Sequence, residues 1–375
     1  MAERVRALRS GWVVRDRVPG PDVDEFAEPE RIVGALAGAR NGTLLAVQHP
    51  HRTPRALAAG LTLREALPQA VATLGELRGL HYRHVHDVVA PYRVDGPDGT
   101  AYGLLCLADP AAVGHTEEVY PDVVAERAGV LTALACVTSA ALLVPVPAGP
   151  PETTGSPRSD LTSLVAAVTD EPAVSMVDPG GRRHWLWLVG PGHHQDALLA
   201  AAGAHPLMVA DGNHRVAAAA AAGLSGLLAL VTAGPDLRVG PIHRAITGTG
   251  LTLAEAVAAW RAVGLDVRPV GDVRPSPGHV IARSGADAVQ VTLPAHGVDH
   301  ALVESVLLER ALGLDPESPH VRPTTTALDA DVMLYLAPVP LPDVLRVHAE
   351  GGRMPRKSTY FTPKPRSGLL LADLD

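Results

Sequence analysis

The chain has 375 residues, 47% of them hydrophobic, which is enough for a sizeable core and for more than one domain. Its net charge of −8 and pI near 6.1 argue against wrapping nucleic acid, because that affinity comes mainly from cation-phosphate contacts. No apolar run reaches the ~18 residues of a membrane span, and the first residues lack the apolar centre of a secretory signal. We therefore expect a cytoplasmic protein with no membrane partner and without nucleic acid. Cys106 and Cys136, each in apolar surroundings, are expected to be reduced and buried.

Helices and strands are predicted to alternate along the chain. In the N-terminal part we expect a helix over 29–40, a strand over 42–48, a helix over 63–77, a strand over 102–107 and a helix over 121–137. His84 and His86 would share one strand face with Asp87 beside them, so a metal site is a weaker alternative to a half-buried strand edge.

A Pro- and Gly-rich stretch divides the predicted elements. We expect an N-terminal α/β region over 1–145 that contributes Glu117, a linker or loop over 146–160, and a second α/β region over 161–375. The second region is predicted to hold helices at 161–168, 253–263, 300–312 and 342–348, and strands at 183–189, 227–232, 332–337 and 369–371, with shorter strands near Val280 and Val289. The order lacks a strict βαβ rhythm, which favours a mixed α/β or α+β fold.

A strand, a tight polar turn and a helix start are predicted in mid-chain. An apolar run and a polar turn, residues 207–213, precede the alanines at 217–222. The first N–H groups and the positive dipole end of such a helix receive anions, Arg215 can grip phosphate through two bonds, and His214 adds a donor. Asp211 can hold Mg²⁺ or a substrate hydroxyl. The alternative is an ordinary N-cap with a solvated polar face.

Arginine replaces lysine almost throughout, and the two lysines lie in one short segment. Lys357 and Lys364 belong to residues 354–364, so we expect a site there that needs a compact ammonium group rather than a planar guanidinium. Chance clustering, or surface ion pairs worth under ~1 kcal/mol, is the alternative. Asparagine is equally rare, and one of its two occurrences is Asn213 in the mid-chain turn.

Two motifs resemble those of a known bacterial family. Ala-Asp-Gly-Asn-His-Arg at 210–215 and Lys-Ser-Thr-Tyr-Phe within 354–364 are similar to the mid-chain and C-terminal motifs of domain of unknown function 1015 (DUF1015). Pro-Ile-His-Arg at 241–244, and Glu117 with Arg127 ten residues later, stand where that family has Pro-x-His-Arg and His-Glu…Asp-Arg segments. The resemblance covers most of the chain, and its C-terminal motif is specific.

The sequence departs from the family pattern at two positions. Asn213 and Thr116 stand where the family usually has histidine, and His115 lies one place before the second. An activity that depends on either histidine would be altered in this chain.

The mid-chain turn is also similar, more loosely, to the phosphate-binding turn of the ParB/sulfiredoxin fold. That fold includes free serine kinases, which use ADP or ATP to make O-phosphoserine, and a ParB group that binds CTP. The resemblance implies a mixed α/β (α+β) protein with a ParB/sulfiredoxin-like nucleotide-binding core and additional α/β elaboration. It also implies ATP or ADP with Mg²⁺ as cofactors, and a small-molecule hydroxyl such as that of free serine as acceptor.

Under this interpretation the site residues fall into three groups. The cofactor would bind through Gly212, Asn213, His214, Arg215, Lys357, Ser358, Thr359 and Lys364. A kinase must take a proton from a hydroxyl, so Glu117 is the expected base, Asp211 and His214 share the catalysis, and Asp211 also holds Mg²⁺. The substrate would contact Arg127, His243 and Arg244. The alternatives are a nucleotide-binding switch without phosphoryl transfer and a family member that keeps the fold only as a scaffold.

Overall fold

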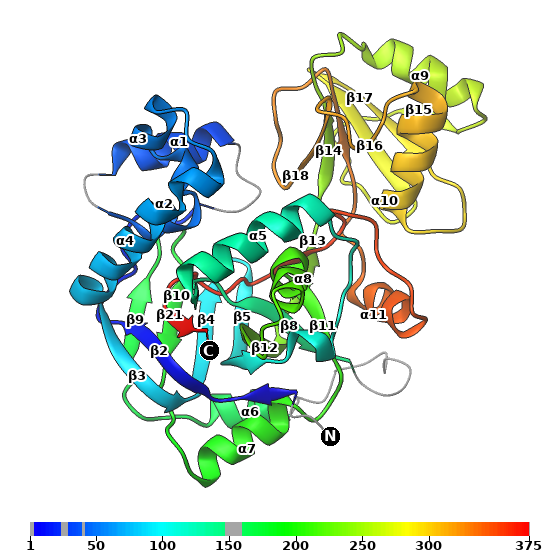
Figure 1. Ribbon diagram of the computed structural model, residues 1–375. Helices are drawn as coiled ribbons and strands as arrows, with labels where there is room; N and C mark the ends of the chain where they lie inside the picture. The colour runs from blue at the N-terminus through cyan, green and yellow to red at the C-terminus, as the bar shows by residue number, and fades with distance from the viewer. Residues whose placement is uncertain (1–3, 24–28, 40–41, 147–159, 375) are drawn as a thin grey trace. The chain divides into compact units, whose positions relative to one another are not determined.

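The computed structural model describes residues 4–23, 29–39, 42–146 and 160–374 (Figure 1). The chain divides into two compact units, the first made of Met1–Leu237 and Thr362–Asp375 and the second of Arg238–Phe361. Both contain helices and strands, which confirms the expected mixed α/β class. The sequence suggested a division at 146–160, but the second unit begins at Arg238. Residues 147–159 are outside the described residues.

The central sheet of the first unit has nine strands in the order β6-β11-β8-β12-β5-β4-β10-β9, with β1 paired to β5. They are β1 (Val5–Arg6), β4 (Ala90–Gly96), β5 (Gly99–Ala108), β6 (Val113–Gly114), β8 (Ala141–Pro145), β9 (Val174–Val177), β10 (Arg183–Leu186), β11 (Leu207–Asp211) and β12 (Leu227–Pro235). β8 pairs with both β11 and β12. The regions expected on either side of the Pro- and Gly-rich stretch therefore share one sheet.

A second sheet of the first unit has four strands in the order β3-β2-β21-β7. They are β2 (Leu8–Val14), β3 (Tyr82–Val88), β7 (Cys136–Val137) and β21 (Leu370–Asp373). The two ends of the chain thus meet in one sheet, because β2 pairs antiparallel with β21. This pairing returns the C-terminal segment to the first unit after the chain has formed the second.

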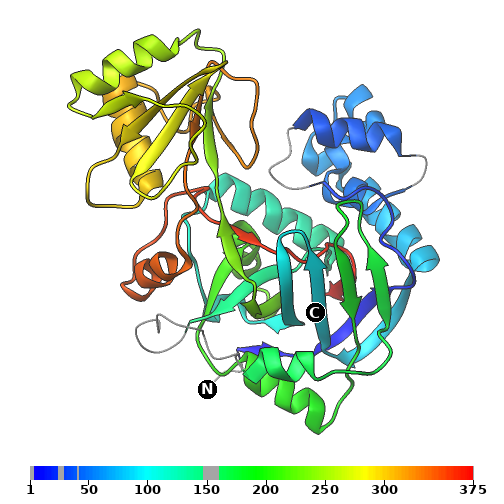
Figure 2. The same cartoon turned by 180° about the vertical axis from the view of Figure 1, so that it is seen from behind.

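Eight α-helices are described in the first unit. They are α1 (Pro29–Gly38), α2 (Leu44–Gln48), α3 (Pro54–Ala58), α4 (Leu63–His81), α5 (Pro121–Leu134), α6 (Asp160–Ala166), α7 (His193–Ala202) and α8 (Asn213–Ala221), with 3-10 turns η1 (Pro50–Arg52) and η2 (Pro110–Ala112). Thr62 and Glu65 form a capping box that starts α4. Helices α5 and α8 lie side by side, and α8 contacts β8 and β11 (Figure 1). Helix α6 contacts β4, β5 and β12 (Figure 2).

The strand predicted over 42–48 is wrong, because residues 44–48 form helix α2. Thr43 has an extended backbone, and its hydroxyl accepts the N–H of Ala46 at 3.1 Å. This N-cap satisfies one of the N–H groups that a helix start leaves without a partner. Leu44, Leu45 and Val47 are buried, so the apolar run that suggested a strand is the buried side of a short helix.

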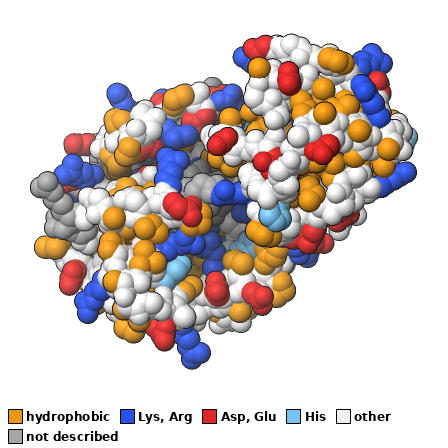
Figure 3. Space-filling model, turned by 90° about the horizontal axis from the view of Figure 1, so that it is seen from above, with side chains coloured by type: hydrophobic (Ala, Val, Ile, Leu, Met, Phe, Trp, Pro, Cys, Tyr) orange, Lys and Arg blue, Asp and Glu red, His pale blue; other side chains and the backbone are white. Residues whose placement is uncertain are grey.

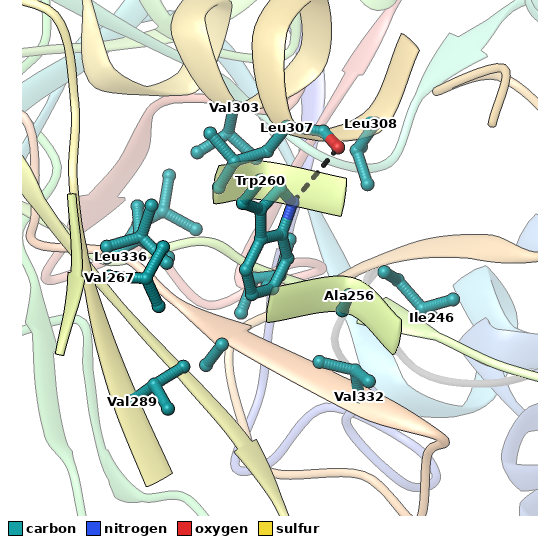
Figure 4. Close-up of a cluster of buried hydrophobic side chains, with 14 of the residues drawn as sticks. Ile246, Ala256, Trp260, Val267, Val289, Val303, Leu307, Leu308, Val332 and Leu336 are labelled. Atoms are coloured by element: carbon teal, nitrogen blue, oxygen red, sulfur yellow. Dashed lines mark hydrogen bonds between the residues drawn. The ribbon is translucent and has the colours of Figure 1, made fainter. Parts of the chain in front are cut away.

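The second unit is built on a six-stranded sheet in the order β15-β17-β16-β19-β14-β18. Its strands are β14 (His243–Ile246), β15 (Val267–Pro269), β16 (His279–Ser284), β17 (Asp287–Thr292), β18 (Val321–Thr324) and β19 (Val332–Tyr335), and a separate pair joins β13 (Arg238–Gly240) to β20 (Tyr360–Thr362). The helices are α9 (Leu253–Ala262), α10 (Asp299–Leu302), which continues as the π-helix η3 (Val303–Leu312), and α11 (Leu341–Ala349). Trp260 is fully buried in the core, and its indole N–H donates to the carbonyl of Leu307 at 3.2 Å (Figure 4).

Charges of both signs are interspersed with apolar side chains on the face that Figure 3 shows. Among the helices of the described ranges, none is both long and apolar enough to cross a membrane. Cys106 and Cys136 are buried, as expected, and burial raises the pKa of their thiols to about 12 and about 11. Both thiols are therefore protonated at neutral pH.

Candidate functional site

The mid-chain turn has the predicted geometry. Strand β11 ends at Asp211, Gly212 has a left-handed backbone with φ of 94°, and α8 begins at Asn213. This left-handed backbone favours glycine, and a Cβ atom added at Gly212 would lie 2.9 Å from Nε of Arg215, so the arginine side chain would have to shift. The first N–H groups of α8 have no intrahelical acceptor and, with the helix dipole, favour negative charge at this end.

Asp211 lies between two cations at the start of α8. Its Oδ2 accepts a bond from Nη2 of Arg215 at 2.5 Å, and its Oδ1 accepts one from Nζ of Lys364 at 2.8 Å. The side chains of Asp211 and Arg215 are each 15% exposed and that of Lys364 is 21% exposed, so solvent reaches this cluster. Lys364, 153 residues away in sequence, is therefore brought to the predicted turn.

Arg215 also holds the turn to the segment between β7 and β8. Its Nη1 donates to the hydroxyl of Ser139 at 2.8 Å and to the carbonyl of Ala140 at 2.5 Å. The guanidinium thus binds groups of the protein in this structure, and its first role is to fix α8 against β8. Neither Ser139 nor Ala140 was expected at the site, because no local pattern marks a residue whose role depends on a distant arginine.

The C-terminal segment that carries Lys364 is fixed to the same region. The hydroxyls of Ser367 and Ser139 are 2.9 Å apart, and the N–H of Gly368 donates to the carbonyl of Thr138 at 3.0 Å. Gly368 has φ of 81°, and a Cβ there would lie 2.2 Å from a methyl of Leu44. Only glycine fits this position, and these contacts place the ammonium group of Lys364 beside the turn.

The two positions that depart from the family pattern contact each other. The side-chain oxygen of Asn213 accepts the N–H of Thr116 at 3.1 Å, and its amide donates to the Thr116 hydroxyl at 3.1 Å. That hydroxyl donates to the carbonyl of Val209 at 2.7 Å, and His115 lies 3.3 Å from the Asn213 oxygen. Glu117, which is half-buried and follows Thr116, is therefore held near the start of α8.

His214 acts as an acceptor in this structure. Its Nε2 accepts the N–H of Tyr120 at 3.1 Å, and the two rings are stacked with their centroids 5.7 Å apart. An imidazole that accepts at Nε2 is neutral and carries its proton on Nδ1. His214 therefore fixes the segment that follows Glu117, a role that the sequence did not indicate.

Arg127 lies in the middle of α5. Burial and the positive charge of Arg127 lower the pKa of His49 to about 4, with smaller effects from Arg52 and His51. The expected substrate ligand is thus close to the start of η1 within the first unit. Among the described residues there is no group of three or more His, Cys, Asp or Glu side chains able to hold a metal ion, so the alternative of a site at His84 and His86 gains no support.

The other predicted site residues belong to the second unit. Arg244 is buried, and its guanidinium donates to the carbonyl of Lys357 at 3.2 Å, to that of Arg356 at 3.3 Å and to the carboxylate of Glu304 at 2.7 Å. Lys357 has a left-handed backbone with φ of 51°, and the Ser358 hydroxyl donates to the carbonyl of Pro355 at 2.6 Å. Arg244 therefore shapes the lysine segment by binding its backbone.

His243 and Thr359 are buried in the same unit. Nδ1 of His243 accepts the N–H of Leu336 at 3.2 Å, and burial together with the Arg244 charge lowers the pKa of His243 to about 4. His243 is therefore neutral at physiological pH. The two lysines thus lie in different units, Lys364 beside Asp211 and Lys357 beside Arg244.

Residues 108–292 match the sequence profile of a family described as "Protein of unknown function (DUF1015)". The matched segment includes the mid-chain turn, Glu117 and Arg244. No curated protein matches the chain.

Several solved structures are similar to part of the protein. A conserved hypothetical protein from Pyrococcus furiosus is 11% identical, with a TM-score of 0.38 and coverage of 72% of this chain and 94% of that one. A free serine kinase in complex with AMP is 13% identical, with a TM-score of 0.38 and coverage of 71% and 92%. SbnI with a C-terminal truncation, from Staphylococcus aureus, is 13% identical, with a TM-score of 0.39 and coverage of 71% and 87%.

Proposed function

We propose that the protein is a nucleotide-dependent kinase that phosphorylates the hydroxyl of a small molecule, with free serine or a similar hydroxy amino acid as the expected acceptor. The observation that carries the proposal is the position of Lys364. Its ammonium group meets Asp211 at the start of α8, where the first helical N–H groups favour an anion. Lysine is rare in this chain and arginine is common, so a lysine at this position is unusual.

Phosphate groups of ATP or ADP would bind at the N–H groups of residues 213–215. Three features favour a phosphate there: the helix dipole, the ammonium of Lys364, and the close approach that Gly212 allows because it lacks a side chain. Lysine acts on phosphate as a point charge, and turning from Asp211 towards a phosphate oxygen needs only rotation about its side-chain bonds. Arg215 would contribute its charge while it stays bound to Ser139 and Ala140.

The donor set fits Mg²⁺ only when the metal is bound together with nucleotide phosphates. Mg²⁺ is commonly held by one or two carboxylates, substrate phosphates and water, and Asp211 supplies a carboxylate beside the proposed phosphate position. When bound, the metal would neutralise phosphate charge. Glu117 is the proposed base for the acceptor hydroxyl, because Thr116 holds it near the start of α8.

Phosphoryl transfer can be measured directly. Purified protein is incubated with serine, Mg²⁺ and either ATP or ADP, and phosphoserine is detected by mass spectrometry. We expect product with the wild type, at least a 10-fold lower rate with Lys364→Met, and at least a 100-fold lower rate with Glu117→Gln. A panel of other small hydroxyl compounds is assayed in parallel, and failure to transfer phosphate to any of them would contradict the proposal.

A nucleotide-binding switch without transfer is the second candidate, and one observation favours it. Asp211 already binds two cations, so metal or substrate must displace a bond before this carboxylate can act. A switch would bind nucleotide with turnover far slower than release. Isothermal titration with CTP, ATP and ADP, combined with a single-turnover assay of the bound nucleotide, separates the two functions.

A further inference from the structure

A buried chain of hydrogen bonds leads from the β9-β10 hairpin to the C-terminal segment of the first unit. The Tyr92 hydroxyl is 2.7 Å from Nδ1 of His184, and Nε2 of His184 is 3.1 Å from Oδ2 of Asp178. At the other end, the N–H of Arg366 donates to the Tyr92 hydroxyl at 3.3 Å. Tyr92 is fully buried and His184 is 1% exposed, so water does not replace these bonds. None of these side chains has a role in the function proposed above.

The donors and acceptors in this chain can be assigned. Burial alone would raise the pKa of Asp178, but the bonds from His184 and from the N–H of Arg182 hold it below its usual value. Asp178 is therefore a carboxylate that accepts the Nε2 proton of His184, which leaves Nδ1 as an acceptor. Tyr92 then donates its proton to Nδ1 and keeps its oxygen lone pairs for the N–H of Arg366. Each member thus fixes the orientation of the next.

This series of hydrogen bonds ends at the N–H of Arg366, two residues from Lys364. A main-chain N–H bonded to a buried hydroxyl cannot move without breaking the bond or exposing an unpaired group, and either change costs free energy. Ser139 and Thr138 hold Ser367 and Gly368, on the far side of Arg366 from Lys364. The anchors nearest to Lys364 among these contacts are therefore at Arg366, whose main-chain N–H is held by the Tyr92 hydroxyl and whose guanidinium pairs with Asp22 at 2.7 Å.

We propose that Asp178, His184 and Tyr92 are positioning residues for Lys364, and that they hold its ammonium group at Asp211 through the main chain at Arg366. This inference rests on the proposed function for its biological meaning, because Lys364 is the proposed phosphate ligand. The geometry itself can be tested without any nucleotide. The chain suits such a test, because its two lysines are in different units and one can serve as the reference for the other.

The experiment measures how fast each lysine is methylated. Full-length protein is treated with limiting formaldehyde and a reductant, and the modification of Lys364 is expressed relative to that of Lys357 by mass spectrometry. We expect Tyr92→Phe to raise this ratio at least threefold and to speed amide hydrogen exchange at Arg366. Tyr102→Phe is the matched control, because it removes a hydroxyl from the neighbouring strand and keeps the ring over which Arg93 lies. The control should leave the ratio unchanged.

Two further variants separate positioning from general loss of structure. Asp178→Asn keeps the shape of the side chain but no longer fixes the proton on His184, so it should raise the ratio by a smaller factor, and it carries the test if Tyr92→Phe does not fold. In an Asp211→Asn background Lys364 has lost its carboxylate partner, so adding Tyr92→Phe should change the ratio no further. An unchanged ratio in folded Tyr92→Phe protein, or an equal effect of Tyr92→Phe with and without Asp211, would overturn the inference.

Nucleotide titration of the same variants tests the proposed function separately. If the methylation ratio changes as expected but the wild type binds no nucleotide, the positioning role stands and the phosphate role of Lys364 fails. If the wild type binds nucleotide and the methylation ratio is unaffected by Tyr92→Phe, the positioning inference fails while the proposed function stands.

Discussion

Replacing Arg215 and Lys364 separately should distinguish the residue that holds the turn from the residue that we propose to bind phosphate. In Arg215→Met, Asp211 would still be paired with Lys364, and Ser139 would still be hydrogen-bonded to Ser367. The carbonyl of Ala140, however, would lose the hydrogen bond that Arg215 donates. A buried group left unpaired costs about 1–3 kcal/mol, and the lost ion pair adds about 1 kcal/mol. We therefore expect a destabilisation of about 2–4 kcal/mol.

Lys364→Met should be much milder. The ion pair is 21% and 15% exposed at its two side chains, so solvent screening limits its worth to about 1 kcal/mol, and methionine keeps the packing of the lysine stem. For a unit of this size each kcal/mol corresponds to about 2–4 °C in melting temperature, so the two variants should differ by several degrees. Lys364→Met is therefore the variant whose loss of nucleotide binding can be interpreted.

Urea unfolding followed by tryptophan fluorescence gives the comparison, since Trp12, Trp185 and Trp187 report on the first unit and Trp260 on the second. Wild type, Arg215→Met and Lys364→Met are measured at the same pH and salt. If Arg215→Met had the same urea midpoint of unfolding as the wild type, the structural role of the guanidinium would be refuted. Equal destabilisation by both variants would refute the separation of roles.

Three further predictions concern single residues. The pKa of His243 is about 4 in the folded protein and 6.5 when unfolded, so the unfolded state takes up the proton first, and His243 alone should cost the second unit about 2 kcal/mol between pH 7 and pH 5. His243→Asn should remove this contribution, which urea midpoints at the two pH values measure, whereas the contribution of buried His300, with a pKa of about 3, should remain. Arg244→Met should free the backbone at Lys357, and trypsin should then cut the lysine segment at least 10-fold faster than in wild type; equal cutting rates would contradict the role of Arg244. Gly368→Ala should destabilise the first unit by more than ~2 kcal/mol, because the added methyl group meets Leu44. Gly250→Ala has a similar φ but lies in open space, so it should cost only about 1 kcal/mol; equal costs in thermal melts would show that the contact with Leu44 is unimportant.

Local patterns predicted the strand, turn and helix at residues 207–222, because a buried apolar run, a glycine and an alanine run act through neighbours in sequence. The strand predicted over 42–48 was wrong for a related reason. A short apolar run fits either structure, and the N-cap at Thr43 decides for a helix. The weaker signal in that segment was the capping threonine, which stands directly before the run.

Long-range pairing could not be predicted from the sequence. The composition change near 146–160 suggested a boundary, yet β8 pairs with β11 and β12 across it, and the second unit begins at Arg238. The rarity of lysine did single out Lys364, but its partner Asp211 is 153 residues away. The bonds of Arg215 to Ser139 and Ala140 also depend on contacts that no local pattern encodes.

We have proposed that the start of α8 binds the phosphate groups of a nucleotide. The most direct measurement is the amide NMR spectrum of labelled protein during titration with ATP and Mg²⁺, with adenosine as the control ligand. We expect the amide signals of Asn213, His214 and Arg215 to shift with ATP but not with adenosine, and Lys364→Met to weaken the response at least 10-fold. Unchanged signals at these three amides, with or without shifts elsewhere in the protein, would contradict it.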